Sequence, residues 1–264
     1  DFWSAKKGRD ALKIQWDESA ALTKSSATLM QEFKALAANP GAVARNDGDA
    51  YGALEGADTL IEAEFELPYL AHATMEPMNC VARVDESGCE VWNGEQMQSA
   101  DQYAIAQLLQ IKPEQVRLNM LYAGGSFGRR ANPHSDYLLE TINIAKTKLG
   151  TAVKLVWTRE DDMRQGYYRP MYYHKIRGGL DKNGKLIAWQ QRIVGQSIVT
   201  GTSFEAFMVK DGVDATSVEG ASTLPYAVPN LNVDLHTVSL PVPVQWWRSV
   251  GHTHTAFTTE VFFD

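Results

Sequence analysis

The sequence predicts an α+β fold. Runs of alternating polar and apolar residues, typical of strands, follow one another directly, and isolated stripes with helical spacing interrupt them. The order lacks the regular strand–helix alternation of a doubly wound sheet. With 264 residues, the chain has the length of one large domain or two small ones and can bury a real core.

The composition is that of an ordinary globular protein, with 44% hydrophobic and 22% charged residues. The formal charge of −7 argues against a nucleic-acid partner. No apolar run approaches the roughly 20 residues of a membrane span, and no secretory signal is present. The chain starts at Asp1 without Met, so we interpret it as a piece of a longer protein.

The N-terminal part predicts a helix over residues 2–12 and a strand over 13–17. A second helix follows. Ser25 or Ser26 would cap it, and Leu29, Met30, Phe33 and Leu36 would share one face. Residues 37–58 are rich in Gly, Asn, Asp and Ala, which predicts a linker or domain boundary.

Residues 59–72 alternate as a half-buried strand does. Their glutamates, Glu62, Glu64 and Glu66, would form a solvated face rather than a metal site. Residues 79–92 predict a hairpin that turns at 86–88. Its two cysteines, Cys80 and Cys89, are too few for a disulfide framework or a zinc site, so buried thiols are expected.

A helix is predicted next, with a capping box of Ser99 and Gln102 and a face of Ala104, Leu108 and Ile111. Residues 115–125 predict a strand that enters a glycine loop. A helix with a stripe of Leu138, Ile142, Ala145 and Leu149, ended by Gly150, follows that loop.

The remainder reads mainly as β structure. Residues 152–157 and 230–240 predict strands, and residues 172–195 predict a long hairpin with Asn183-Gly184 as its turn. Residues 245–263 lead into a final helix.

The glycine loop, YAGGSFGRRANPHSDY over residues 122–137, offers bare backbone. Gly124, Gly125 and Gly128 ahead of a helix would suit a phosphate or an oxo group, and Arg129 and Arg130 could add charged hydrogen bonds. The spacing matches neither G-x-G-x-x-G nor a P-loop. By spacing alone, a tight turn that needs positive φ is the better explanation.

Five segments, taken together, carry a resemblance. LAHATMEPMNCVA, VWNGEQ, GGSFGRRANPHSDYLLETINIAK, VKLVWTREDDMRQGYYRP and QWWRSVGHTHTAFTTEVFFD occur in the order and spacing of the molybdenum hydroxylases. The chain resembles this xanthine dehydrogenase and aldehyde oxidase superfamily. It is most similar to the large (β) subunit of isoquinoline 1-oxidoreductase and to membrane-bound aldehyde dehydrogenases, over almost its whole length.

The resemblance implies that residues 1–45 are the tail of an α/β hammerhead domain. Residues 46–264 would be the first part of a molybdopterin-binding domain with mixed sheets and a few helices. The implied cofactor of the full-length protein is molybdenum-molybdopterin, in bacteria commonly the cytosine dinucleotide form. It would hydroxylate an N-heteroaromatic ring carbon or an aldehyde with oxygen from water. Electrons would leave through 2Fe-2S clusters on a small partner subunit.

The resemblance also implies site residues. Gln96 matches the glutamine that hydrogen-bonds an oxygen ligand of molybdenum, unless it is an ordinary polar residue. Phe127, flanked by Gly125 and Gly128, matches a segment whose backbone N–H approaches the oxo group, unless it is a core aromatic. Arg248 matches a cofactor-contacting arginine, unless it stacks on a neighbouring tryptophan. We assign the whole cofactor-binding set to these positions: Gln96, Gly124, Gly125, Ser126, Phe127, Gly128, Arg129 and Arg248. His72 and Glu76 are interpreted as structural.

The chain departs from the family pattern at three points. A glutamate four residues past the loop Phe in some members is Ala131 here, which puts purine recognition in doubt. Ser126 replaces the commonest glycine. The G-x-G-E segment with the catalytic glutamate is absent, so this piece alone is expected to be inactive and to bind no cofactor.

Two other classes of function stay open. A non-enzymatic binding module would use an exposed row of the seven tryptophans, most of which we expect to be buried. A phosphate- or nucleotide-binding enzyme would use the glycine loop alone. Relatives with the F-G-R-R variant often carry an export signal, which favours a periplasmic or inner-membrane location over the cytoplasm.

Overall fold

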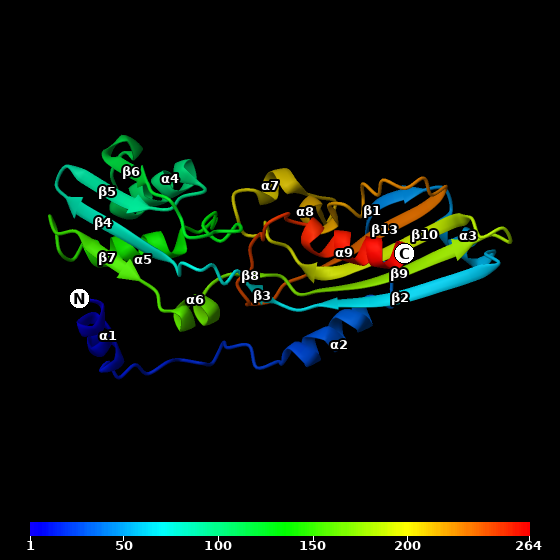
Figure 1. Cartoon of the computed structure of the whole chain (residues 1–264), viewed down its shortest axis with the longest axis horizontal. Coiled ribbons are helices and arrows are strands. Elements are labelled where there is room, and N and C mark those ends of the chain that lie inside the picture. Colours follow the sequence, from blue (N-terminus) through cyan, green and yellow to red (C-terminus); the bar gives the residue numbers. More distant parts are fainter. The chain divides into compact units, whose positions relative to one another are not determined.

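The computed structural model describes residues 1–264 and contains two compact units (Figure 1). Unit 1 comprises residues 1–23, 73–125 and 135–165. Unit 2 comprises residues 24–72, 126–134 and 166–264. The chain therefore passes between the units several times, and the predicted α+β class is confirmed in both.

Unit 1 is built on a four-stranded sheet with the order β6-β5-β4-β7. Its strands β4 and β5 form the predicted hairpin, and β5 pairs with β6 in parallel. The elements of unit 1 are α1 (Phe2–Asp10), β4 (Asn79–Asp85), β5 (Gly88–Asn93), α4 (Gln98–Leu109), the 3-10 helix η1 (Pro113–Gln115), β6 (Val116–Met120), α5 (Asp136–Ala145), β7 (Val153–Val156) and α6 (Arg159–Gln165).

The core of unit 1 lies between this sheet and the helices α4 and α5. Cys80 and Ala82 alternate inward along β4, and Ile105 from α4 and Ile142 from α5 are buried in the same cluster. Both cysteines are buried free thiols, as predicted. This packing fixes the positions at which the neighbouring strands β5 and β6 end.

Unit 2 contains a five-stranded sheet with the order β1-β13-β10-β9-β2. The β9–β10 hairpin turns at Gly184, which has the left-handed φ of +76° that the Asn-Gly turn requires. The elements of unit 2 are α2 (Ser26–Leu36), β1 (Ala42–Asp47), α3 (Ala50–Glu55), β2 (Thr59–Leu67), β3 (Leu70–Ala71), β8 (Tyr168–Arg169), β9 (Tyr172–Leu180), β10 (Leu186–Gln196), α7 (Glu205–Met208), β11 (Val209–Lys210), β12 (Val213–Asp214), α8 (Ala215–Val218), β13 (Asn230–Val238) and α9 (His252–Phe263).

Helices cover both faces of this sheet. A Cβ at Gly178 would lie 3.1 Å from the ring of Phe262 in α9, whereas a Cβ at the next residue, Gly179, would lie 3.4 Å from Leu54 in α3. Because neighbouring strand residues point to opposite faces, α9 and α3 are on opposite sides of β9. The sheet thus has buried residues on both faces.

Three local predictions are wrong. Residues 13–17 form no strand, since they pair with no neighbouring strand. The segment 37–58, predicted as a linker, contains β1 and α3. In α4 the N-cap is Met97, without a side-chain cap, and the buried residues are Asp101, Ile105 and Ala106 instead of the predicted face.

The predicted strand with the acidic face is confirmed as β2. Its glutamates form surface ion pairs, Glu66 with Lys34 at 2.6 Å and Glu62 with Arg177 at 2.7 Å. No helix in the structure combines the length and apolarity needed to cross a membrane.

Candidate functional site

Two predicted site residues of unit 1 follow the ends of neighbouring parallel strands. β5 ends at Asn93 and β6 ends at Met120, which are paired in register. The N–H of Leu121 donates to the carbonyl oxygen of Asn93 at 2.8 Å, so the two chains leave the sheet together. Gln96 and Gly124 therefore both lie beyond the same sheet edge, and both are exposed.

Gly124 is held by Glu76. The N–H of Gly124 donates to the Glu76 carboxylate at 2.6 Å, and the N–H of Glu76 donates back to the Gly124 carbonyl at 3.1 Å. A Cβ at Gly124 would lie 2.5 Å from the Cβ of Glu76, so this close approach requires glycine. Glu76 is thus structural, as interpreted from the sequence, and the Gly124 amide is already engaged.

The part of the loop in unit 2, residues 126–134, begins with a tight turn. The N–H of Arg129 donates to the Ser126 carbonyl at 2.9 Å, and the N–H of Arg130 donates to Oγ of Ser126 at 3.0 Å. Phe127 has a φ of +55° and Gly128 a φ of +102°. A positive φ at a non-glycine residue such as Phe127 is strained.

This strained turn leaves two donors available. The N–H groups of Phe127 and Gly128 donate to no acceptor in the protein, although the carbonyl groups of both residues accept hydrogen bonds. Consecutive N–H groups in such a turn form a concave site for an anion or an oxo group. The glycines can therefore both form a tight turn and leave backbone donors for a ligand.

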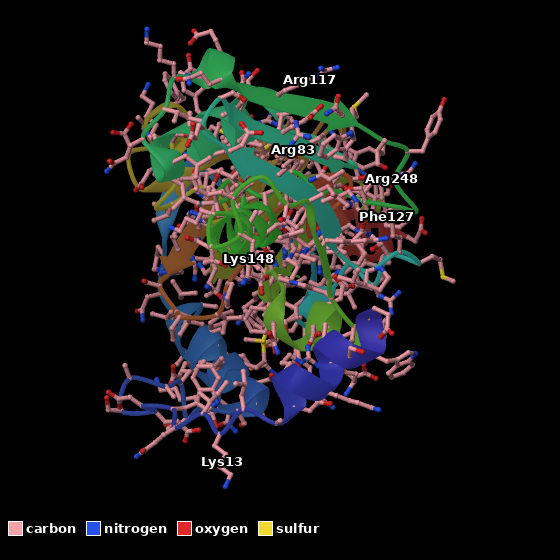
Figure 2. All side chains as sticks on the ribbon, turned by 90° about the vertical axis from the view of Figure 1, so that its left-hand side faces the viewer. Lys13, Arg83, Arg117, Phe127, Lys148 and Arg248 are labelled. Atoms are coloured by element: carbon pink, nitrogen blue, oxygen red, sulfur yellow. The ribbon has the colours of Figure 1, made fainter.

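A second loop packs against this turn. The N–H of Arg248 donates to the Phe127 carbonyl at 2.7 Å, and Figure 2 shows the two residues close together. Gln245 is fully buried; its Nε2 donates to the Gly128 carbonyl at 3.1 Å. Oε1 of Gln245 accepts from the Asn132 side chain at 2.8 Å. Three hydrogen bonds thus join residues 127–132 to residues 245–248.

His72 packs against the second loop, residues 245–248. Its ring stacks on Trp247 with a centroid distance of 4.7 Å, and its Nε2 lies 3.0 Å from the Trp246 carbonyl, to which it donates. Burial lowers the pKa of His72 to about 4. The ring is therefore neutral near pH 7, and its stacking on Trp247 and its bond to Trp246 hold the second loop.

The three arginines differ in their availability. Arg129 and Arg130 are each only 2% exposed, and the Arg129 guanidinium lies 5.7 Å from the centre of the Tyr167 ring. The Arg248 side chain is exposed and has no ion-pair or hydrogen-bond partner within the protein. Arg248 is therefore the arginine best placed to bind an anionic ligand.

These positions weaken the phosphate-site alternative. A phosphate-binding loop would hold its anion at the N-terminus of the following helix. Here that helix, α5, begins at Asp136, eight residues after Gly128. The guanidinium groups of Arg129 and Arg130 are buried instead of facing solvent. The loop therefore does not present its glycines at a helix N-terminus.

The expectation that most tryptophans are buried is wrong. Trp189 alone is buried, at 1% exposure, whereas Trp3 and Trp16 are 67% and 74% exposed. Both lie in the segment 1–23. Its helix α1 has no buried residue. They are too few to form the continuous aromatic row that the binding-module alternative requires.

The donor set fits a molybdenum-pterin cofactor better than a directly bound metal ion. No group of three or more His, Cys, Asp or Glu residues is placed to hold a metal. The backbone donors at Phe127 and Gly128 and the exposed Arg248 suit a group that carries oxo and phosphate acceptors. A Cβ at Gly128 would lie 2.8 Å from the Trp246 carbonyl, so bare backbone is required there.

Sequence reasoning missed Gln245 and Asn132, which hold the two loops together. A polar residue in the apolar stretch PVPVQWW was the available signal for Gln245. Its partners lie 113 and 117 residues away, so their identity could not be read from local spacing.

Comparison with known proteins identifies the family. The model of the molybdopterin cofactor-binding domain matches residues 36–264. The membrane-bound aldehyde dehydrogenase (pyrroloquinoline-quinone) of Gluconacetobacter polyoxogenes is 30% identical over the whole chain. The isoquinoline 1-oxidoreductase subunit beta of Brevundimonas diminuta is 25% identical, also over the whole chain. The chain spans 35% of the length of each of these two relatives.

Solved structures support the same fold. Quinoline 2-oxidoreductase from Pseudomonas putida 86 matches 98% of this chain and 33% of its own, with a TM-score of 0.76 at 19% identity. The aldehyde oxidoreductase from Desulfovibrio gigas matches 85% of this chain and 24% of its own, with a TM-score of 0.64 at 19% identity. With the family model covering residues 36–264, the chain belongs to the molybdopterin cofactor-binding domain family.

Proposed function

We propose that this chain forms part of the cofactor cradle in the large subunit of a molybdenum hydroxylase. The whole enzyme would oxidatively hydroxylate an N-heteroaromatic ring carbon or an aldehyde, with oxygen taken from water. One observation carries the proposal. The N–H groups of Phe127 and Gly128 have no protein acceptor and lie in a turn that a 2.7 Å bond fixes to Arg248.

The protein contributes positioning and electrostatics, while the bound molybdenum cofactor would supply the redox chemistry. Phe127 and Gly128 would donate their backbone N–H groups to an acceptor on the cofactor. Donors held in place before binding lose little entropy when they bind. Arg248 would neutralise an anionic group of the cofactor, because its guanidinium is exposed and has no other partner.

The remaining residues of the proposed set would position the cofactor or shape the turn. Gln96, which follows the end of β5, would donate its side-chain amide to the cofactor. Gly124 and Gly125 would supply backbone that approaches the cofactor closely. Ser126 and Arg129 would shape the turn, since both bond within it.

Three features of the whole enzyme belong to the same proposal. The cofactor would be the cytosine dinucleotide form, electrons would pass to a small 2Fe-2S subunit, and the complex would lie in the periplasm or at the inner membrane of a bacterium. Relatives are named as subunits of larger enzymes, which supports the partner. One relative is named membrane-bound, which supports the location.

Substrate class and activity of the isolated piece are also proposed. Ala131 stands where some members carry a glutamate, so we propose that purines are not substrates. A base glutamate in a G-x-G-E segment is absent from these residues, so the piece alone would be inactive. Residues 1–45 would be the tail of the hammerhead domain, and residues 46–264 the first part of the cofactor-binding domain.

The test is cofactor analysis of the full-length protein produced together with its small subunit. We expect stoichiometric molybdenum and a pterin dinucleotide in the parent, and reduced molybdenum in Gly128→Ala, which crowds the turn, and in Gln96→Ala and Arg248→Ala. Arg177→Ala, which removes only a surface ion pair, is the matched control. Extraction of pyrroloquinoline quinone from a complex that lacks molybdenum would overturn the proposal.

A further inference from the structure

Four side chains form a directed hydrogen-bond chain inside unit 2. The Trp189 indole N–H donates to Oε1 of Gln191 at 3.3 Å, and Nε2 of Gln191 lies 3.2 Å from Nδ1 of His174. Nε2 of His174 lies 2.9 Å from Nδ1 of His254. None of the four side chains is more than 1% exposed, so water does not compete for these bonds.

The direction of the chain follows from its first member. An indole nitrogen can only donate, so it fixes the amide of Gln191 with Nε2 toward His174. Nδ1 of His174 therefore accepts, and the ring carries its proton on Nε2. That N–H donates to Nδ1 of His254, which places the His254 proton on Nε2. Burial lowers the pKa of His174 to about 3 and that of His254 well below its usual value, so both rings are neutral.

The chain ends at a small cavity. Its volume is about 10 Å³, which is room for one water-sized particle. Arg169 and His254 both line the cavity. Nε2 of His254 and Nε of Arg169 are buried and have no hydrogen-bond partner in the protein. Both atoms are N–H donors, so the occupant must be an acceptor.

Most other polar groups of the wall are already engaged. Both ends of the Gln245 amide are bonded, and the Thr216 hydroxyl donates to Asp214 at 2.7 Å. The carbonyl groups of Trp247 and Gly251 accept N–H groups at 2.8 and 3.2 Å. Thr253 carries a hydroxyl, which can also donate. A water molecule would need acceptors for its own protons, and the wall offers few.

Charge favours a negative occupant. Arg169 has no carboxylate within ion-pair distance, and its guanidinium donates only to the Pro68 carbonyl at 2.7 Å. The wall also includes Gly251, Thr253 and His254 at the start of α9, where the Glu219 carboxylate accepts the Gly251 N–H at 2.9 Å, so Arg169 is the positive charge that faces the cavity. The two oxygens of the nearby Asp214 are saturated by Ser197, Thr216 and Ser217.

We propose that this cavity is a binding site for one small anion of the halide class, held by Nε2–H of His254 and Nε–H of Arg169. The bound ion lies against the segment 246–251, which carries Arg248, and holds that segment to the start of α9. The site does not depend on the proposed enzymatic function, because none of its ligands binds the molybdenum cofactor in that proposal.

Anomalous diffraction from crystals of the purified protein soaked in sodium bromide tests the site directly. We expect one bromide peak within hydrogen-bonding distance of both nitrogens. A water molecule without anomalous signal, or a collapsed cavity, would overturn the proposal. Molybdenum content is not part of this measurement, so its outcome is separate from that of the cofactor test.

A thermal-unfolding series gives a second measurement. At constant ionic strength, replacing isethionate by chloride should raise the melting temperature of the parent. This chloride-specific increase should disappear in Arg169→Met and persist in the control Arg177→Met, whose arginine is on the same sheet unit but pairs with Glu62. An equal chloride response in Arg169→Met would contradict the site even if that variant is less stable.

Discussion

The backbone N–H of Arg248 donates to the carbonyl oxygen of Phe127 at 2.7 Å, across 121 residues of sequence. This bond fixes the turn in which the N–H groups of Phe127 and Gly128 have no acceptor within the protein. Arg248 is thereby placed beside the donors with which it would share an anionic ligand. The same two loops are joined a second time through Gln245.

Gln245 should be essential for the order of this loop pair. In Gln245→Leu the Asn132 side chain loses its acceptor and the Gly128 carbonyl loses a donor, in a fully buried position. We expect a loss of about 1–3 kcal/mol in the free energy of unfolding. Denaturant unfolding measures it, with the exposed Gln107→Leu as the control. Equal stability of the two variants would contradict this role.

Gly128 should tolerate alanine less well than another glycine with positive φ. Gly128 has a φ of +102° and a Cβ would lie 2.8 Å from the Trp246 carbonyl, whereas Gly184 has a φ of +76° with open space around it. Gly184→Ala should cost about 1–2 kcal/mol of backbone strain. Gly128→Ala should cost more and also reduce the molybdenum content of the full-length complex. The same loss in both variants would show that crowding at Trp246 is unimportant.

Arg248 should matter for cofactor retention and not for folding. Its exposed guanidinium has no protein partner, so Arg248→Ala should change the free energy of unfolding by no more than about 0.5 kcal/mol. Loss of one charged hydrogen bond, about 1.5–3 kcal/mol, should weaken cofactor binding roughly 10- to 150-fold. Molybdenum retention during gel filtration measures this, and Arg248→Lys should retain part of it. Unchanged retention in Arg248→Ala would remove Arg248 from the site.

Acid should destabilise the protein through its buried histidines. The pKa of His72 is lowered by burial to about 4, below the value of about 6.5 in the unfolded chain. The unfolded state therefore takes up a proton first, and stability is full above about pH 6.5 and falls as the pH drops toward 4. At about pH 5 His72 should contribute a loss on the order of 2 kcal/mol.

The variant His72→Gln isolates that contribution. Its loss of stability between about pH 7 and pH 5 should be smaller than that of the parent, because glutamine does not titrate. The exposed Gln107→Leu, which removes no titratable group, should retain the parental pH dependence. Identical pH profiles for the parent and His72→Gln would contradict the assignment.

Much of the fold could be predicted where the signal is local. The alternation of residues 59–67, the Asn183-Gly184 turn and the Ser25 cap each depend on neighbours within a few residues, and β2, the β9–β10 hairpin and α2 form there. The prediction for α4 was wrong because burial of Asp101 and Ile105 is decided by packing against β6 and α5, which the helix's own spacing does not show.

The sequence by itself determined the family, because five segments in a fixed order carry that information without any coordinates. It also led to the prediction that Phe127, Gly128 and Arg248 belong to the cofactor site. Only the tertiary structure decided which groups at these positions are available: the Gly124 amide is engaged by Glu76, Arg129 is buried, and Arg248 is exposed. The sequence also did not indicate Gln245 or the His174–His254 chain. The partners of Gln245 and His254 lie 80 or more residues away, and Gln191 contacts His174 across the β9–β10 hairpin. Whether a donor or acceptor already has a partner within the protein depends on such long-range contacts, which the local spacing of residues does not show.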